Sequence, residues 1–177
     1  MASKLHDELT YKTLYWLNNR AWDLRWCSEL TISNSCVVDA SAIYYPKRDH
    51  RIKLGLPEPV SDKISCVFES KISKPDFNNT FGVSSVRPRC VPLAHIHWIV
   101  TPKDIITHSD VPDPWGWLVQ RGRGLKIERL PRICDIDELQ MLRLANAILW
   151  KREPWFRKHD IELLEQHFDD EEYPCNT

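Results

Sequence analysis

Hydrophobic residues recur along this chain of 177 residues at two spacings, which predicts helices and strands in one protein. Near the N-terminus the apolar positions fall at helical spacing, so we expect a helix over residues 3–19. Apolar runs of strand length follow at residues 36–45, 63–71 and 95–101, and a short strand is expected at 29–32. The first two thirds of the chain are therefore expected to form a sheet preceded by a helix.

The remaining segments predict the connections and a helical C-terminal part. The polar, proline-punctuated stretch 46–62 predicts a long hairpin-type connection, and Pro75 with Asp76 predicts a helix start. The runs WGWLVQ and LKIERL, joined by RGRG, predict a β-hairpin, and the KDII segment predicts a short helical turn. An amphipathic helix is expected over 135–150 and a shorter one over 160–168. Together these elements predict a mixed α/β (α+β) fold with a central mixed sheet flanked by helices.

Length and composition place these elements in one domain. A chain of this size buries a sizeable core, so we expect a single domain over residues 1–168 and an acidic tail at 169–177. No stretch resembles a signal peptide or a membrane span, which predicts a cytoplasmic protein without membrane partners. The six cysteines are scattered without a CxxC pair, so we interpret them as reduced thiols.

The net charge of −1 conceals an uneven distribution. Residues 31–134 carry 15 Lys and Arg against 10 Asp and Glu, whereas residues 135–177 carry 5 against 11. The whole surface is therefore not that of a general polyanion binder, but the central part is expected to present a positive face.

Candidate chemistry lies in the strand predicted at 63–71, which closes on Glu69 and Lys71. Side chains two residues apart in a strand share a face, so these two are expected roughly 7 Å apart on one face. An acid and a base on a partly apolar face cost free energy to bury unless something uses or neutralises them. Asp39, in the apolar run CVVDASAIYY, would supply a second carboxylate. Two acids and a lysine indicate a site for a divalent cation and an activated water.

Asp39, Glu69 and Lys71 match the pattern D-(x)n-E-x-K, and the chain therefore resembles the PD-(D/E)XK nuclease superfamily, which has the restriction-endonuclease-like fold. The segments SELTISNSCVVDASAIY, ESKISKPDF, HWIVTP and WGWLVQRGRGLKIERLP look like the MmcB-type branch of small bacterial nucleases associated with DNA repair. The resemblance covers residues 5–132. The long connection before the E-x-K strand and the segment after the DF pair depart from that branch.

This resemblance implies a metal-dependent nuclease that hydrolyses phosphodiester bonds in DNA. Asp39, Glu69 and the main-chain carbonyl of Ser70 would hold Mg²⁺ or Mn²⁺. Lys71 would orient or deprotonate the attacking water while the cation stabilises charge on the phosphate. Many relatives of this fold act as dimers, so a homodimer is an arrangement that the resemblance allows.

Further acids and bases are candidates for supporting roles. Glu29 is expected as a third acid of the site, or else as a residue that merely opens its strand. Glu8 on the first helix is the alternative source of an extra carboxylate. Weaker candidates for contact with phosphate are Ser73, Lys74, Lys47, Arg48, Arg51, Arg87 and Arg89, and the last five are expected to flank the site.

Other interpretations stay open from the residues alone. Acids and lysines in these positions are also typical of solvated groups at strand ends, and ion pairs between such groups contribute little to stability. A protein of the same fold without catalysis would bind nucleic acid or a protein partner, and an interaction module that uses exposed tryptophans is a third hypothesis. His95 and His97 alternate along one strand, near Cys90, but their spacing matches no compact zinc module. The sequence does not distinguish DNA from RNA, or endo- from exonucleolytic cleavage.

Overall fold

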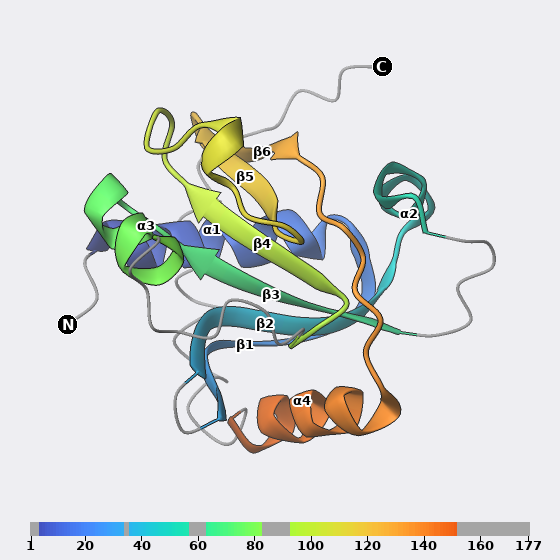
Figure 1. The fold of residues 1–177 in the computed structure, drawn as a ribbon. Coiled ribbons are helices and arrows are strands. Elements are labelled where there is room, and N and C mark those ends of the chain that lie inside the picture. Colours follow the sequence, from blue (N-terminus) through green and yellow to red (C-terminus); the bar gives the residue numbers. More distant parts are fainter. Residues whose placement is uncertain (1–3, 34–35, 57–62, 83–92, 152–177) are drawn as a thin grey trace.

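The computed structural model describes residues 4–33, 36–56, 63–82 and 93–151, which alternate between strands and helices (Figure 1). The first half contains α1 (Lys4–Asn18), β1 (Ala21–Ser33), β2 (Cys36–Pro46), α2 (Arg48–Leu54) and β3 (Ile64–Ser70). The second half contains α3 (Lys74–Phe81), β4 (Ile96–Thr101), the 3-10 turn η1 (His108–Asp110), β5 (Gly116–Arg121), β6 (Gly124–Arg129) and α4 (Glu138–Lys151).

Six strands form one mixed sheet, in which they lie side by side in sequence order. Strands β1, β2 and β3 are an antiparallel meander, β3, β4 and β5 are parallel, and β6 returns antiparallel to β5. Parallel strands need a crossover connection, and α3 lies in the connection between β3 and β4. The C-terminal ends of β3, β4 and β5 therefore meet at one edge of the sheet, beside α3 (Figure 1).

Helices cover both faces of the sheet. The largest cluster of buried side chains joins α1 to the face that carries Phe68 and Trp98, with Leu9 and Leu17 supplied by the helix. Helix α4 covers β1 and β2 on the other face, where Leu144 and Ile148 lie in a second cluster. A third cluster packs α3 against β4 and β5. This burial of apolar surface on two sides is what holds the mixed sheet together.

Local sequence chemistry explains the start of α3. The Ser73 hydroxyl accepts a hydrogen bond from the main-chain N–H of Asp76, at 3.3 Å, and so caps the helix. The Asp76 carboxylate accepts in turn from the N–H of Ile72, at 3.0 Å. Pro75 lies in the first turn, where its missing N–H has no helical partner to lose. These contacts fix the chain immediately after β3, and confirm the predicted helix start.

The mixed α/β fold with a central sheet flanked by helices is confirmed. The predicted extent of β1 is wrong, because its pairing with β2 begins at Ala21 rather than at residue 29. The predicted loop 46–62 contains α2, which ends at Gly55 in the left-handed conformation that favours glycine. The KDII segment carries no helix, and the short helical turn lies at η1 instead. The helix expected over 160–168 and the acidic tail lie outside the described residues, and in the described segments no helix is long and apolar enough to cross a membrane.

Candidate functional site

The register of the β2–β3 pair places Asp39 beside the E-x-K motif. Ala40 lies opposite Phe68, so the next residues along the two strands are Asp39 and Glu69. The Asp39 carboxylate accepts a hydrogen bond from the main-chain N–H of Ser70, with an N–Oδ2 distance of 2.7 Å. A side chain of β2 thus takes the place of a main-chain acceptor at the end of β3. Segments that are distant in the sequence are joined there by a direct contact.

Glu69 and Lys71 form a buried ion pair at the same point. The Lys71 Nζ atom lies 3.0 Å from Glu69 Oε2, and each residue is only 6% exposed. Lys71 extends the strand by one residue, because its N–H donates to the carbonyl of Val100 in β4 at 2.8 Å. Burying either charge without a partner would be costly, and the contact between the two groups offsets part of that cost. The side chains share a face, as the strand alternation predicted.

Ser70 contributes through its main chain and its hydroxyl. Its N–H points toward β2, since it donates to Asp39. In an antiparallel pair the N–H and C=O groups of one residue point to the same neighbouring strand, so the Ser70 carbonyl is directed toward β2 as well. Its Oγ atom lies 3.3 Å from Thr10 Oγ1 of α1. The predicted carbonyl ligand and the two acids are therefore contributed by adjacent positions of β2 and β3.

Helix α1 adds a histidine that the sequence interpretation missed. His6 Nε2 lies 3.2 Å from Asp39 Oδ2, and both side chains are about one fifth exposed. The hydrogen bond that His6 donates to the Asp39 carboxylate raises the pKa of His6 above its ordinary value, against the opposing effects of burial and of the Lys71 charge. Glu8 instead pairs with Lys12 along the helix, at 2.6 Å. The helical side chain that reaches Asp39 is thus His6, and Glu8 contacts a different partner.

The signal for His6 was present in the helix pattern. His6, Thr10 and Thr13 recur at spacings of four and three, so that they share one face of α1. Thr10 and Thr13 are buried, and both donate their hydroxyl hydrogens to carbonyls four residues earlier in the helix. Polar residues on a buried helical face indicate that the helix crosses polar groups of the sheet. The identity of those groups required the tertiary structure.

Glu29 lies in β1, across from Asp39 and on the side of β2 that faces away from β3. Its neighbours pair in register, Ser28 with Ala40 and Leu30 with Val38, which leaves Glu29 across from Asp39. Its φ of 48° is a left-handed value, and its side chain is exposed. Its carbonyl accepts a hydrogen bond from Lys151 of α4. The role of Glu29 as a third acid stays a prediction.

The donor set at the end of β3 suits a hard divalent cation. Mg²⁺ is typically bound by one or two carboxylates and keeps several waters, and Asp39 and Glu69 with the Ser70 carbonyl offer oxygen atoms only. Among the residues that the structure describes, no group of three or more His, Cys, Asp or Glu side chains is placed to hold a metal ion. An ion here would therefore depend on two carboxylates, a carbonyl and water. These residues fit Mg²⁺ or Mn²⁺ and do not form a closed cage.

Residues predicted to contact phosphate lie in different places. Ser73 caps α3, which favours the turn role over a phosphate contact. Lys74 pairs with Asp110 of η1 at 2.7 Å, and this hydrogen bond lowers the pKa of Asp110 to about 2. Both residues lie directly after the E-x-K strand, at the same sheet edge as the acids.

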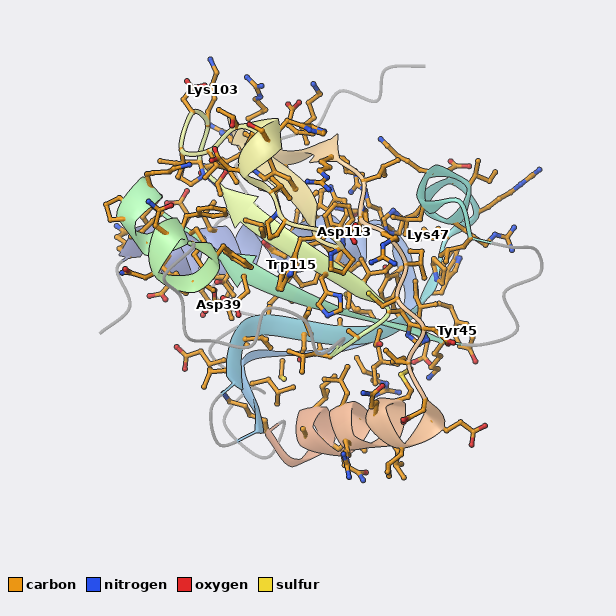
Figure 2. All side chains as sticks on the ribbon, viewed as in Figure 1. Asp39, Tyr45, Lys47, Lys103, Asp113 and Trp115 are labelled. Carbon is orange, nitrogen blue, oxygen red and sulfur yellow. The ribbon has the colours of Figure 1, made fainter. Side chains whose placement is uncertain are left out.

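The expectation that Lys47, Arg48 and Arg51 flank the site is wrong. They follow the C-terminal end of β2, whereas Asp39 lies near the start of that strand. At the rise of a strand, Asp39 is about 23 Å from Pro46, the last residue of β2. Figure 2 shows Asp39 and Lys47 at opposite ends of the sheet. Lys47 donates to the Asn19 carbonyl at 3.1 Å. Arg87 and Arg89 lie outside the described residues.

The histidines of β4 are held by protein contacts. His97 Nε2 accepts from the N–H of Leu93 at 3.1 Å, and its Nδ1 atom lies 3.8 Å from Cys134 Sγ. Burial lowers the pKa of His97 to about 4. His95 Nδ1 contacts Ser65 Oγ at 2.9 Å. These contacts favour packed histidines over zinc ligands; Cys90 lies outside the described part of the chain.

Comparisons with known proteins give a fold relative. No protein-family model and no curated protein matches the sequence. Among solved structures, the fold is similar to that of a protein of unknown function from Silicibacter pomeroyi, with a TM-score of 0.60 and 11% sequence identity. The superposition covers 99% of this chain and 100% of that protein. At this identity the likeness shows that the two chains share a fold, without bearing on activity.

Proposed function

We propose that this protein is a metal-dependent nuclease that hydrolyses phosphodiester bonds in DNA and acts in DNA processing or repair in the cytoplasm. The observation that carries the proposal is the contact cluster at the end of β3. Asp39 binds the N–H of Ser70 at 2.7 Å, and Ser70 stands between Glu69 and Lys71, which pair at 3.0 Å. A mixed sheet flanked by helices agrees with the PD-(D/E)XK resemblance, and supports the same proposal.

Asp39, Glu69 and the Ser70 carbonyl would hold Mg²⁺ or Mn²⁺. When bound, such an ion supplies charge stabilisation for the phosphate oxygens and lowers the pKa of a coordinated water. The Ser70 N–H and His6 both contact Asp39 Oδ2, and so fix the orientation of that carboxylate. A carboxylate held from two sides loses little conformational freedom when it binds a ligand, which favours binding.

Lys71 would act on the attacking water or on the phosphate. Its ammonium group donates a hydrogen bond to Glu69 and carries further N–H donors that would be available to a nucleophile or a phosphate oxygen. In the hydrolysis the water oxygen forms a bond to phosphorus, and the bond from phosphorus to the leaving oxygen breaks. The proton of the attacking water passes to solvent water, and the leaving oxygen takes up a proton from solvent. A fixed positive charge beside the phosphorus stabilises the charge that develops on the phosphate oxygens.

A second candidate function is binding of nucleic acid or a protein partner without cleavage. The observation that favours it is that the polar groups of the site already bind one another. Asp39 is paired with His6 and Ser70, and Lys71 is paired with Glu69 in a nearly solvent-free position. Charged groups that already bind one another can stabilise a fold without taking part in catalysis.

Cleavage assays distinguish the two functions. Purified protein is incubated with labelled single-stranded, duplex and branched DNA, with Mg²⁺, with Mn²⁺ or with a chelator. We expect metal-dependent cleavage that the chelator and Lys71→Met abolish, and that Lys126→Met retains, since Lys126 is an exposed residue of β6. Intact DNA under all conditions would overturn the nuclease proposal. Salt-sensitive retention of intact DNA would then support the binding function.

A further inference from the structure

Helix α4 has two apolar faces, and the sheet covers only one of them. Leu144 and Ile148 are buried in the cluster that joins the helix to β1 and β2. On the other side Leu139, Leu142 and Leu149 are 54%, 55% and 58% exposed. These leucines belong to an ordered helix whose inner face is fixed to the sheet (Figure 1). A row of exposed leucines on one helix indicates a surface that a partner covers.

The spacing of the outer face is that of a two-stranded coiled coil. Leu139, Leu142, Asn146 and Leu149 follow one another at intervals of three, four and three, which is the a–d–a–d series of two heptads. Asn146, at the second a position, is exposed like the leucines. An asparagine at an a position specifies register in paired helices, because its amide bonds to the same residue of the partner. This pattern indicates another helix with the same series.

The charges beside the row fit a parallel second copy. Glu138 occupies the g position that immediately precedes Leu139, and Arg143 occupies the e position of the heptad that Leu139 begins. In a parallel pair, a g residue lies beside the e residue five positions later on the partner helix. Glu138 of each copy would therefore face Arg143 of the other, twice by symmetry. Both side chains are exposed.

We propose that the outer face of α4 is the interface of a homodimer, in which two copies of the helix pair in parallel about a two-fold axis. The row of four side chains spans only about 16 Å of helix, so the interface is small and the dimer is expected to dissociate on dilution. The inner face of α4 keeps its contacts with the sheet. The proposal does not depend on the nuclease activity.

Sedimentation equilibrium of the full chain over a range of concentrations tests the interface. We expect a monomer–dimer equilibrium for the wild type, and a loss of dimer of at least about tenfold in Leu142→Glu, because a charge would be buried between the helices. Ile52→Glu, an equally exposed apolar position of α2, is the matched control and is expected to dimerise normally. A wild type that stays monomeric, or a dimer that Leu142→Glu leaves intact, would overturn the proposal. A monomer that Leu142→Glu destabilises to heat would show that residues of the same chain cover the face, and would overturn it too.

A charge exchange tests the parallel register. Glu138→Arg alone and Arg143→Glu alone each place like charges opposite one another, so both are expected to weaken the dimer severalfold. The double variant Glu138→Arg with Arg143→Glu restores opposite charges and is expected to restore the dimer. If the loss of dimerisation free energy in the double variant equals the sum of the losses in the two single variants, parallel pairing of these residues is contradicted.

Discussion

The Ser70 main-chain N–H donates a hydrogen bond to the Asp39 carboxylate, with a distance of 2.7 Å. This bond ties an acid of β2 to the residue between Glu69 and Lys71, although the two strands are separated in sequence by α2 and its flanking segments. In an extended strand residue the carbonyl points to the same side as the N–H, so the Ser70 carbonyl is expected to face β2 as well. The candidate site is therefore built into the pairing of β2 and β3.

The variant Asp39→Asn removes the negative charge of this residue but keeps an oxygen atom that can accept the hydrogen bond from Ser70. The asparagine amide oxygen can accept from Ser70 as the carboxylate does, so at a pH where His6 is neutral we expect little change in the free energy of unfolding. The loss of negative charge is expected to weaken Mn²⁺ binding and to lower DNA cleavage at least about a hundredfold. Calorimetric titration with Mn²⁺ and thermal unfolding measure the two effects. Asp104→Asn, at an exposed loop position, is the control; equal Mn²⁺ affinity in both variants would contradict the assignment.

Ser73→Ala tests the capping role of the residue after the motif. Loss of the hydroxyl removes the acceptor for the Asp76 N–H, so the free energy of unfolding is expected to fall by about 1 kcal/mol. Ser73→Asp keeps an acceptor and is expected to keep most of the stability. Denaturant unfolding gives the values. If Ser73→Ala keeps full stability but loses DNA retention, Ser73 contacts phosphate and is not primarily a cap.

The burial of His97 is expected to make the folded chain less stable in weak acid. The pKa of this histidine is about 4 in the folded chain, because it is buried, against about 6.5 when unfolded. The unfolded chain therefore takes up the proton first as the pH falls, so the stability is full above pH 6.5 and decreases toward pH 4. Between pH 7 and pH 5 the loss from this residue is about 2 kcal/mol. His97→Gln keeps an acceptor for the Leu93 N–H and is expected to flatten the pH dependence of urea unfolding. Identical slopes for variant and wild type would contradict the burial of a neutral histidine.

Gly116 tests the register of β4 and β5. A Cβ atom at this position would lie 2.5 Å from the Trp98 ring and 2.8 Å from the nitrogen of Pro131. We therefore expect Gly116→Ala to lower the free energy of unfolding by about 1–3 kcal/mol. Gly124→Ala, at the start of β6, meets no atom within 4 Å and is the matched control. Equal stability of both variants would show that Trp98 does not lie against Gly116.

Hydrophobic periodicity predicts most of the elements that form the site. The segments of α1, β2, β3 and β4 have uninterrupted patterns, and their bounds agree with the prediction to within two residues. The sequence pattern underestimates the length of β1, because the strand contains a register shift between Trp22 and Arg25 that breaks the alternation of apolar and polar residues. Helix α2 buries only His50 and Leu54, so its pattern is too weak to separate from a loop.

The sequence predicts the parts of the candidate site that lie on strands. It does not predict the part that depends on where helix α1 packs. Alternation places Glu69 and Lys71 on one face, and pairing of adjacent strands brings Asp39 to them. The contact of His6 with Asp39 depends on how α1 crosses the end of β3, which no local pattern specifies. The misplacement of Lys47 has a simpler reason. It follows the last residue of β2, a full strand length from Asp39, and the direction of the strand alone would have excluded it.

The central claim is that Asp39 and Glu69 share one divalent cation at the end of β3. A crystal structure of the chain with Mn²⁺, with data collected at an X-ray energy where manganese scatters anomalously, tests it most directly. We predict an anomalous peak within coordination distance of both carboxylates and of the Ser70 carbonyl, absent in crystals of Asp39→Asn. No peak at this position, or a peak held by other residues alone, would contradict the claim.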